Sequence, residues 1–224
     1  MVLDRPDPVH LPGPARSCPV RSSQASRVTP TVLGMEIIDH LGDRIRCIQN
    51  AFTATECADF LHVAERIGFH EAPITSFDGF VMAPDIRNNT RVIHDDPRLA
   101  AALWVRLAPA VPARIDGWSA VGLNERFRFY RYTPGQFFAW HRDGSFRRNE
   151  REQSLVTLMI YLDEGFEGGS TDFDVPQREA TIRVVPERGA VLLFRHGLRH
   201  QGASVVRGVK HVLRTDVMYQ RDAP

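Results

Sequence analysis

The chain has 224 residues, a hydrophobic fraction of 43% and a charged fraction of 25%, which are ordinary values for a globular protein of one domain. Its formal net charge of +1 provides no global basic field of the kind that nucleic-acid-binding domains carry. No apolar run approaches the roughly 18 residues of a membrane span, and the N-terminus lacks the apolar core of a signal peptide. Together these features predict a cytoplasmic protein that does not cross a membrane.

Residues 1–34 are rich in Pro, Arg and Ser and have little apolar periodicity, which predicts a flexible N-terminal tail. We expect the folded domain to span residues 35–224. The three cysteines, Cys18, Cys47 and Cys57, are odd in number and do not form a CxxC pair. They are therefore expected to be reduced thiols, consistent with a cytoplasmic location.

Local signals predict two short strands and then two helices. Isoleucines on either side of a turn at Gly42-Asp43 indicate the strands. A capping-box pattern from Thr53 to Glu56, followed by a helical apolar stripe, predicts a helix over residues 54–67. Asp96 as N-cap, with proline at the next position, predicts a second helix that ends near Pro109. The polar segment 77–91 between the helices is expected to be a loop.

The pattern changes from helix to strand after residue 126. Alternating side chains, a strongly apolar run over 155–162, and further runs at 181–185, 190–194 and 209–219 predict a series of strands. Residues 195–208 are expected to form a loop. Many short strands that follow two helices favour an α+β fold, with a double-stranded β-helix (jelly-roll) core and flanking N-terminal helices.

His141 and Asp143 are the first candidates for metal ligands. In an extended backbone, side chains at i and i+2 point to the same face, so both could reach one metal ion. Two histidines and one carboxylate form the facial triad of non-haem Fe(II) oxygenases, which leaves positions open for a cosubstrate and O₂. His200 is the candidate for the second histidine, and His196 in the same predicted loop is its rival.

A cation near this triad could hold the distal carboxylate of a dicarboxylic cosubstrate. Lys210 lies ten residues after His200, and strand alternation places it on the same face as Arg214 and Asp216. Arg214 is the alternative, because its planar fork suits a carboxylate. It could instead contact substrate or pair with Asp216.

Three motifs, in this order, resemble the Fe(II)/2-oxoglutarate dioxygenases of the prolyl 4-hydroxylase branch. They are Tyr132-Thr-Pro-Gly-Gln-Phe-Phe-Ala-Trp-His-Arg-Asp143, then Leu158-Met-Ile-Tyr-Leu162 with Phe166-Glu-Gly-Gly-Ser-Thr171, and finally His200-x-Gly-x-x-Val-x-x-Gly-x-Lys210. The resemblance spans about residues 35–222 and does not include the tail. Because only His200 has the Gly-x-x-Val context and the offset to Lys210, it is favoured over His196.

The resemblance implies that His141, Asp143 and His200 bind Fe(II) and that Lys210 forms a salt bridge with the C5 carboxylate of 2-oxoglutarate. Tyr132 and Tyr161 would lie near this cosubstrate, although both could equally be core aromatic residues. O₂ would be the second cosubstrate and ascorbate an accessory reductant. The implied reaction hydroxylates an unactivated C–H bond and releases succinate and CO₂. Relatives that halogenate lack the carboxylate ligand, so Asp143 favours hydroxylation.

Other classes of protein use similar residues. A zinc hydrolase could use two histidines and a carboxylate, but the chain lacks a His-Glu-x-x-His motif and Lys210 would then have no role. A non-catalytic binding module would be expected to have lost a ligand, and all of them are present. A nucleic-acid demethylase could use the arginine-rich stretch 126–151, but the near-neutral net charge does not support it.

The resemblance suggests a prolyl or other aminoacyl side chain as substrate, or a small amino-acid-like metabolite. Selectivity is expected to come from the 77–91 loop, the 144–153 loop and Arg214. The arginine-rich stretch could be a solvated strand face, or it could attract an anionic substrate or cosubstrate.

Overall fold

The computed structural model of the protein describes residues 27–29, 34–76, 79–176 and 181–222. Most of the predicted tail, residues 1–26 and 30–33, lies outside these ranges. Strand β1 (Arg27–Thr29) falls inside the predicted tail and pairs antiparallel with β2 (Glu36–Asp39). Residues 27–29 of that segment are thus a strand at the edge of a sheet, and the division into a tail and a domain at residue 35 stays a prediction.

Both predicted helices are present, with the predicted caps. Helix α1 (Ala54–Ile67) begins after Thr53, whose hydroxyl accepts a hydrogen bond from the Glu56 amide while the Glu56 carboxylate accepts from the Thr53 amide. Helix α2 (Pro97–Leu107) begins after Asp96, whose carboxylate accepts from two backbone amides of the first turn. A short 3-10 turn, η1 (Ala108–Ala110), follows it. No described helix is long and apolar enough to cross a membrane.

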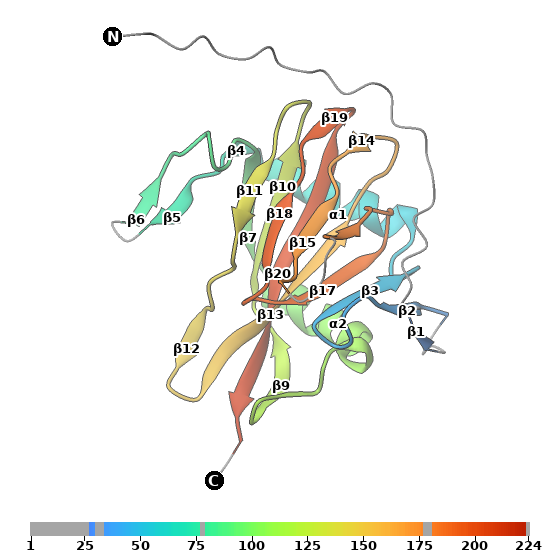
Figure 1. Cartoon of the computed structure of the whole chain (residues 1–224), viewed down its shortest axis with the longest axis vertical. Helices are drawn as coiled ribbons and strands as arrows, with labels where there is room; N and C mark the ends of the chain where they lie inside the picture. The colour runs from blue at the N-terminus through green and yellow to red at the C-terminus, as the bar shows by residue number, and fades with distance from the viewer. Residues whose placement is uncertain (1–26, 30–33, 77–78, 177–180, 223–224) are drawn as a thin grey trace, which may run out of the picture.

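The structure is mostly β, and its larger sheet is antiparallel (Figure 1). The strand order is β1, β2, β3 (Ile45–Gln49), β17 (Val191–Arg195), β13 (Glu152–Tyr161), β20 (Lys210–Arg221), β10 (Arg126–Tyr132), β7 (Thr90–Asp95) and β4 (His70–Glu71). Three more strands pair beside this path: β8 (Arg114–Ile115), β9 (Trp118–Leu123) and β12 (Arg147–Asn149). The two longest strands, β13 and β20, lie at its centre and pair along most of their length.

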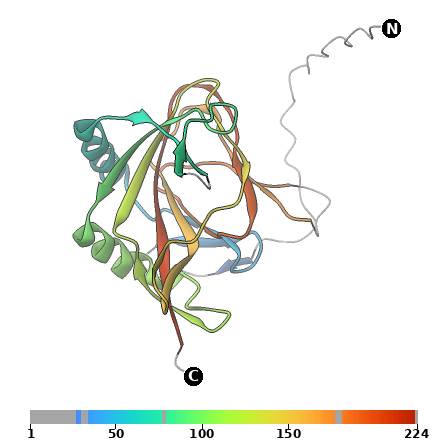
Figure 2. The same cartoon turned by 90° about the vertical axis from the view of Figure 1, so that its left-hand side faces the viewer.

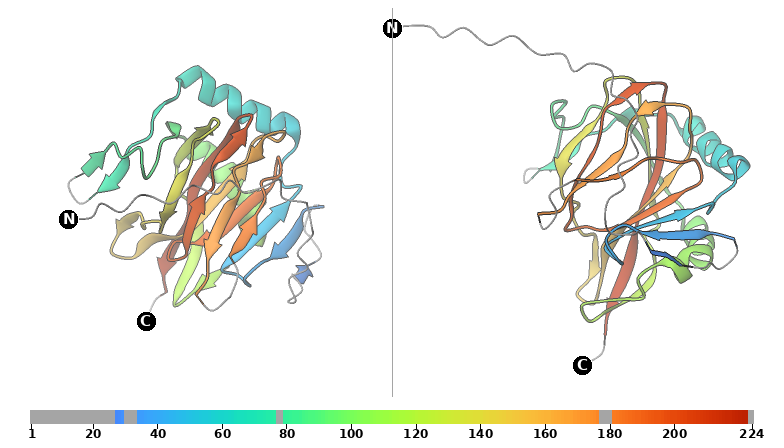
Figure 3. Two further views of the ribbon diagram at one scale, coloured as in Figure 1. Left: turned by 45° about the horizontal axis from the view of Figure 1, so that its top comes forward. Right: turned by 45° about the vertical axis from the view of Figure 1, so that its right-hand side comes forward.

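The smaller sheet has the order β11 (Phe138–His141), β18 (Arg199–Gly202), β15 (Thr171–Asp174) and β16 (Ile182–Val184). Two two-stranded ribbons complete the fold: β14 (Glu167–Gly168) with β19 (Val205–Arg207), and β5 (Ile74–Ser76) with β6 (Gly79–Val81). Figures 2 and 3 show how the strands of the smaller sheet lie across from the larger one.

Three segments that we predicted as loops contain strands; one of them, residues 144–153, includes β12 and the start of β13. Residues 195–208 include β18 and β19, and the described part of 77–91 includes β6 and the start of β7. The reason is that these strands are short and their polar residues do not alternate with apolar ones. β18 and β19 pair with strands from distant parts of the chain, such as β15 and β11 for β18, whereas β6 pairs with its neighbour β5.

The larger sheet has a different hydrophobic core on each face. One face packs against the helices, with Leu158 and Leu213 in the same cluster as Leu103. Both helices lie on this side of the sheet (Figure 2). Side chains on the opposite face, such as Tyr130, belong to a second cluster that includes Phe173 of the smaller sheet. The space between the two sheets is therefore lined by alternate residues of β10, β13 and β20.

Candidate active site

His141, Asp143 and His200 meet between the two sheets. His141 ends β11 and His200 lies on β18, where the two residues are register partners. Asp143 follows two residues after His141, beyond the end of the strand. Among the described residues, these three form the one group of at least three potential ligands whose donor atoms all lie within 4.8 Å of one another. His141 Nε2 lies 3.6 Å from Asp143 Oδ1, and His200 Nε2 lies 3.7 Å from Asp143 Oδ2.

Backbone carbonyls fix the orientation of both histidine rings. Nδ1 of His141 is 2.8 Å from the Ala139 carbonyl oxygen, and Nδ1 of His200 is 3.0 Å from the Leu198 carbonyl oxygen. A carbonyl can only accept, so Nδ1 carries the proton in each ring and Nε2 keeps its lone pair. Burial lowers the pKa of His200 to about 4, against the opposing charge of Asp143, so this ring is neutral at physiological pH. Both rings therefore direct Nε2 toward one carboxylate, as metal ligation requires.

The Asp143 carboxylate is buried and held as an anion. Burial would raise its pKa, but the positive charge of the Arg214 guanidinium outweighs burial and holds it well below the usual value. Arg214 Nη2 lies 3.1 Å from Oδ1, and the Thr157 hydroxyl donates to Oδ2 at 2.6 Å. The carboxylate is therefore already charged and oriented by Arg214 and Thr157.

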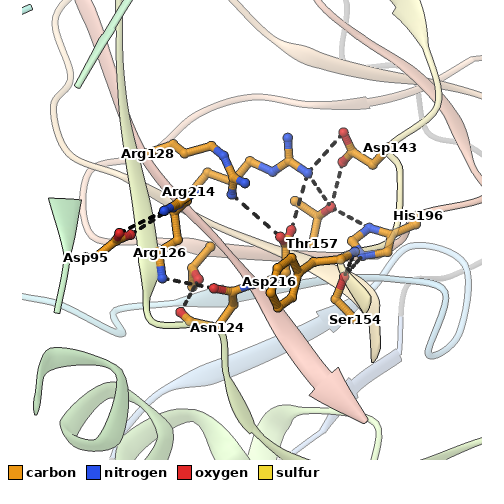
Figure 4. A network of polar contacts seen from close by, with 12 residues as sticks. Asp95, Asn124, Arg126, Arg128, Asp143, Ser154, Thr157, His196, Arg214 and Asp216 are labelled. Atoms are coloured by element: carbon orange, nitrogen blue, oxygen red, sulfur yellow. Dashed lines mark hydrogen bonds and ion pairs between the residues drawn. The ribbon is translucent and has the colours of Figure 1, made fainter. Parts of the chain in front are cut away.

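His196, the rival ligand, has both ring nitrogens engaged elsewhere. Its Nδ1 lies 3.0 Å from the Thr157 hydroxyl and its Nε2 lies 3.0 Å from the Ser154 hydroxyl (Figure 4). Because Thr157 donates its proton to Asp143, it accepts from His196, and Ser154 then donates to Nε2. His196 thus belongs to a buried chain of hydrogen bonds that runs from Ser154 to Asp143, and it is absent from the three-residue cluster.

Lys210 begins β20 and is buried between aromatic rings. Its Nζ donates to the Gly169 carbonyl at 2.5 Å and lies 5.4 Å from the Tyr132 ring centroid and 5.5 Å from that of Tyr161. Burial lowers its pKa to about 8, partly opposed by Asp163 and Asp172. A buried ammonium with no carboxylate in contact among the described residues is suited to bind an anion.

One cavity joins these groups and has a volume of about 420 Å³, including the part open to solvent. It is lined by six of the seven candidate site residues: Tyr132, His141, Asp143, His200, Lys210 and Arg214. Tyr161, the seventh, is fully buried beneath it and its hydroxyl is 2.8 Å from the Thr171 hydroxyl. Apolar side chains, among them Phe138, Met159 and Phe194, form much of the remaining wall.

Sequence reasoning missed three residues of the site. Thr157 supports Asp143, Thr171 lines the cavity beside Tyr161, and Arg87 lies over the rings of Tyr130 and Phe138. Thr171 was visible as the end of the Gly-Gly-Ser-Thr turn, and Arg87 lies within the segment expected to control selectivity. Thr157 had no local signal, because it is one polar residue in an apolar strand.

The chain was compared with known proteins. Residues 127–215 match the family model described as the 2OG-Fe(II) oxygenase superfamily, a segment that contains all three candidate ligands and Lys210. A search of curated protein sequences gave no match.

Solved structures with a similar fold include several prolyl hydroxylases. A Pseudomonas putida prolyl-4-hydroxylase matches with a TM-score of 0.59 and 19% identity, over 79% of this chain and 92% of that one. A Trichoplax adhaerens prolyl hydroxylase, solved with a hypoxia inducible factor peptide fragment, matches with a TM-score of 0.63 and 15% identity, over 78% and 83%. A viral collagen prolyl hydroxylase from Paramecium Bursaria Chlorella virus-1, in complex with 2OG, matches with a TM-score of 0.52 and 20% identity, over 79% and 96%.

The matched segment and the fold agree with each other and with the site. The chain is an enzyme of the 2OG-Fe(II) oxygenase class, with a fold like that of the prolyl hydroxylases. Its cofactor is Fe(II) and its cosubstrate is 2-oxoglutarate. The jelly-roll core expected from the sequence is the fold that these oxygenase structures share.

Proposed function

We propose that the protein hydroxylates an unactivated C–H bond and converts 2-oxoglutarate and O₂ to succinate and CO₂. The observation that carries this proposal is the single cavity in which a two-histidine, one-carboxylate cluster and a buried lysine face the same space. The three-residue cluster alone would suit several metals. The buried cation adds a site for a dicarboxylate, which a hydrolase would not need.

The donor set fits iron in its reduced form. Two imidazoles held by backbone carbonyls and one charged carboxylate, all with oriented donor atoms, form the set typical of non-haem Fe(II) oxygenases. In our proposal His141, Asp143 and His200 hold the ion. When bound, iron with 2-oxoglutarate supplies the oxidising power for the C–H bond, and the residues described next do the binding, orientation and exclusion of water.

Lys210 is the proposed partner of the C5 carboxylate of 2-oxoglutarate. Arg214 competes poorly for this role, because its guanidinium already lies 3.1 Å from Asp143 and 3.3 Å from Asp216. Both of these carboxylates are buried, so moving Arg214 to a ligand would leave them uncompensated. We propose that the Thr171 hydroxyl and the Tyr132 ring complete this end of the cavity, with Tyr161 orienting Thr171 from below.

The walls of the cavity suit an oxidation that must exclude water. Phe138, Phe194 and Val212 present apolar surface to the same space as the candidate ligands. A dry cavity strengthens the attraction between Lys210 and an anion and prevents solvent from consuming a reactive oxidant. These residues would therefore bind the cosubstrate tightly and protect the reaction.

A zinc hydrolase is the second candidate and is less well supported. It needs a general base near the metal. Among the described residues that line this cavity and the one beside it, the carboxylates are Asp143 and Asp216, and Arg214 is paired with both. Neither is free to accept a proton from water. Only the oxygenase proposal gives Lys210 a role.

The proposed substrate is an aminoacyl side chain in a peptide, as the prolyl hydroxylase structures suggest, or a small amino-acid-like molecule. We also propose a cytoplasmic location. Its support is that Cys47 and Cys57 are buried free thiols, as expected in a reducing compartment. Burial raises the pKa of Cys47 to about 12, so this thiol is unreactive.

The proposal is tested by titrating the Fe(II)-loaded protein with 2-oxoglutarate in the absence of oxygen. A weak visible metal-to-ligand charge-transfer band is expected, because the cosubstrate would chelate the iron through its C1 carboxylate and keto oxygen. Fe(II) binding without this band would contradict the proposal and favour a metal site with another use.

A further inference from the structure

A second cavity opens beside the first and shares His141 and Asp143 with it. Its volume is about 1330 Å³, including the part open to solvent. Five arginines line it: Arg87, Arg91, Arg128, Arg142 and Arg214. The two acidic residues in its wall, Asp143 and Asp216, lie on either side of Arg214 at hydrogen-bond distance. The wall therefore has more positive than negative charge before any metal ion is bound.

Arg87 is buried in this wall and is held rigidly. Only 4% of its surface is exposed, and its guanidinium carbon lies 4.4 Å from the Tyr130 ring centroid and 4.5 Å from that of Phe138. Its Nε donates to Asn89 at 2.7 Å, and its backbone forms a bridge with Phe138 of β11. Within the described part of the chain, nothing accepts a hydrogen bond from its Nη2.

Arg128 on β10 has a similar unsatisfied nitrogen. Its Nη1 is buried and lies 3.6 Å from Asp216, beyond hydrogen-bond distance, and it too has no acceptor among the described residues. Asp216 is closer to Arg214, at 3.3 Å. A buried guanidinium nitrogen without an acceptor is costly and rare in native proteins, so two of them in one cavity wall point to an acceptor that a water, an ion or a ligand supplies.

The pKa of Tyr130 reflects the combined positive charge of the arginines around it. Burial would raise the pKa of its phenol, but the positive charges of Arg87, Arg214 and Arg128 outweigh burial and lower it. Burial also lowers the pKa of Arg91, and the nearby Arg87 and Arg128 add to that effect by repulsion. The positive charge of this cavity is therefore not neutralised by its own carboxylates.

The Arg87 guanidinium lies close to the candidate metal site. Phe138, on which Arg87 lies, stacks on the His141 ring with centroids 3.6 Å apart and an interplanar angle of 16°. One aromatic ring thus separates the Arg87 guanidinium from a candidate iron ligand. A small molecule bound through an oxyanion at Arg87 would keep its carbon skeleton near the metal.

We propose that the substrate carries a carboxylate or phosphate group, and that Arg87 and Arg128 bind this oxyanion in the second cavity. This inference rests on the proposed function, since it names the substrate class of the same site. The two anions would then bind at different places: 2-oxoglutarate at Lys210, and the substrate at Arg87 and Arg128. The guanidinium fork suits both carboxylates and phosphates.

The test uses the full chain loaded with Fe(II) and saturated with 2-oxoglutarate under nitrogen, so that the cosubstrate site is occupied. The probes are N-acetylglycine, its uncharged amide N-acetylglycinamide, and inorganic phosphate. Binding is followed by calorimetric titration and by perturbation of the charge-transfer band. We expect saturable binding of at least one of the two anions and none of the amide. The anion that binds with the higher affinity indicates whether the substrate carries a carboxylate or a phosphate.

The variants Arg128→Gln and Arg87→Gln are expected to weaken anion binding about 10-fold or more, because a charge-assisted hydrogen bond is lost. Arg126→Gln is the matched control. Arg126 lies on the same strand but pairs with Asp95, both side chains being about half exposed, and is expected to leave binding unchanged. Because Arg87 is buried, its variant is interpreted only if its melting temperature and 2-oxoglutarate affinity match the wild type; Arg128→Gln tests the proposal by itself.

The inference is wrong if wild type binds neither anion, if the amide binds as well as the acid, or if Arg128→Gln and Arg126→Gln behave alike. It is also wrong if Arg128→Gln weakens 2-oxoglutarate instead of the probe anion. In each case an intact charge-transfer band would leave the proposed oxygenase function standing, whereas loss of the band in wild type would contradict that function.

Discussion

The Thr157 hydroxyl donates a hydrogen bond of 2.6 Å to Oδ2 of Asp143, and the two residues come from different parts of the site. Thr157 lies in the central strand β13, whereas Asp143 follows the end of β11. Behind Thr157 stand His196 and then Ser154, each buried (Figure 4). The candidate ligand is thus held by a buried side chain of the central strand β13.

Replacing Thr157 by valine should weaken Fe(II) binding by about 10- to 100-fold, because a ligand loses the group that orients it. Valine keeps the shape of threonine, so the loss would come from the hydrogen bond. Thr157→Ser is the matched control and should retain wild-type affinity. Anaerobic Fe(II) titration measures both variants, and equal affinity of Thr157→Val and wild type would contradict this role.

The choice between the two histidines is tested by paired substitutions. His200→Ala should abolish Fe(II) binding, because its Nε2 is one of three candidate donors. His196→Ala should leave a measurable site, since its nitrogens contact Thr157 and Ser154 rather than the other ligands. Metal content after dialysis against Fe(II) under nitrogen gives the comparison. Loss of iron to the same extent in both variants would show that our assignment of His200 is wrong.

Lys210→Met should lower the affinity for 2-oxoglutarate by about 10- to 100-fold, because the lost bond is to a charged group in a buried site. The affinity for Fe(II) should stay the same. The charge-transfer band gives the 2-oxoglutarate affinity, and metal titration in its absence gives the iron affinity. Unchanged 2-oxoglutarate binding would transfer the role to Arg214.

The pKa of Lys210 predicts opposite effects of pH on cosubstrate binding and on stability. The folded pKa is about 8 and the usual value is 10.5, so between these values the unfolded chain holds a proton that the folded chain has lost. Binding of 2-oxoglutarate needs the charged lysine, so affinity should fall by up to about tenfold per pH unit above pH 8.

Stability of the protein without 2-oxoglutarate should rise over the same pH range, because the unfolded state binds more protons there. The full shift corresponds to about 3 kcal/mol. Chemical unfolding at several pH values, compared with Lys210→Met, isolates this contribution. A variant with the same pH dependence as wild type in both measurements would exclude Lys210 as the titrating group.

The substitution Gly189→Ala would test how tightly the chain packs between β13, β17 and the start of α1. Its φ is +80°, and a Cβ atom there would lie 2.0 Å from the Phe52 carbonyl oxygen. Gly135 has a similar φ of +83° but open space around it, so Gly135→Ala is a control for backbone strain alone. Gly189→Ala should cost at least about 2 kcal/mol more than Gly135→Ala in the free energy of unfolding. Equal costs would mean that the backbone relieves the clash.

Sequence patterns predicted those parts of the fold that local chemistry determines. The caps at Thr53 and Asp96 fixed the starts of both helices, and the apolar run near 155–162 marked the central strand. The motifs around His141 and His200 predicted three ligands, and these residues form a compact cluster in the structure. The function of this cluster as an iron site is still a prediction.

The remaining features depend on register between distant strands. β18 has no apolar alternation, so only its pairing with β11 and β15 makes it a strand. Thr157 and Arg87 acquire their roles from the neighbours that this pairing brings near them, and no local pattern records those neighbours. The chain of hydrogen bonds through His196 was invisible for the same reason.

His141 and His200 are register partners on β11 and β18, and β11 is the outermost strand of the smaller sheet. An ion bound by both residues would act as a reversible cross-link between the edge strand β11 and the inner strand β18. Loss of the ion would then release β11 before the rest of the fold, and with it Phe138, on which the Arg87 guanidinium rests. Chelation should therefore accelerate amide hydrogen exchange in residues 138–141 while β13 and β20 remain protected.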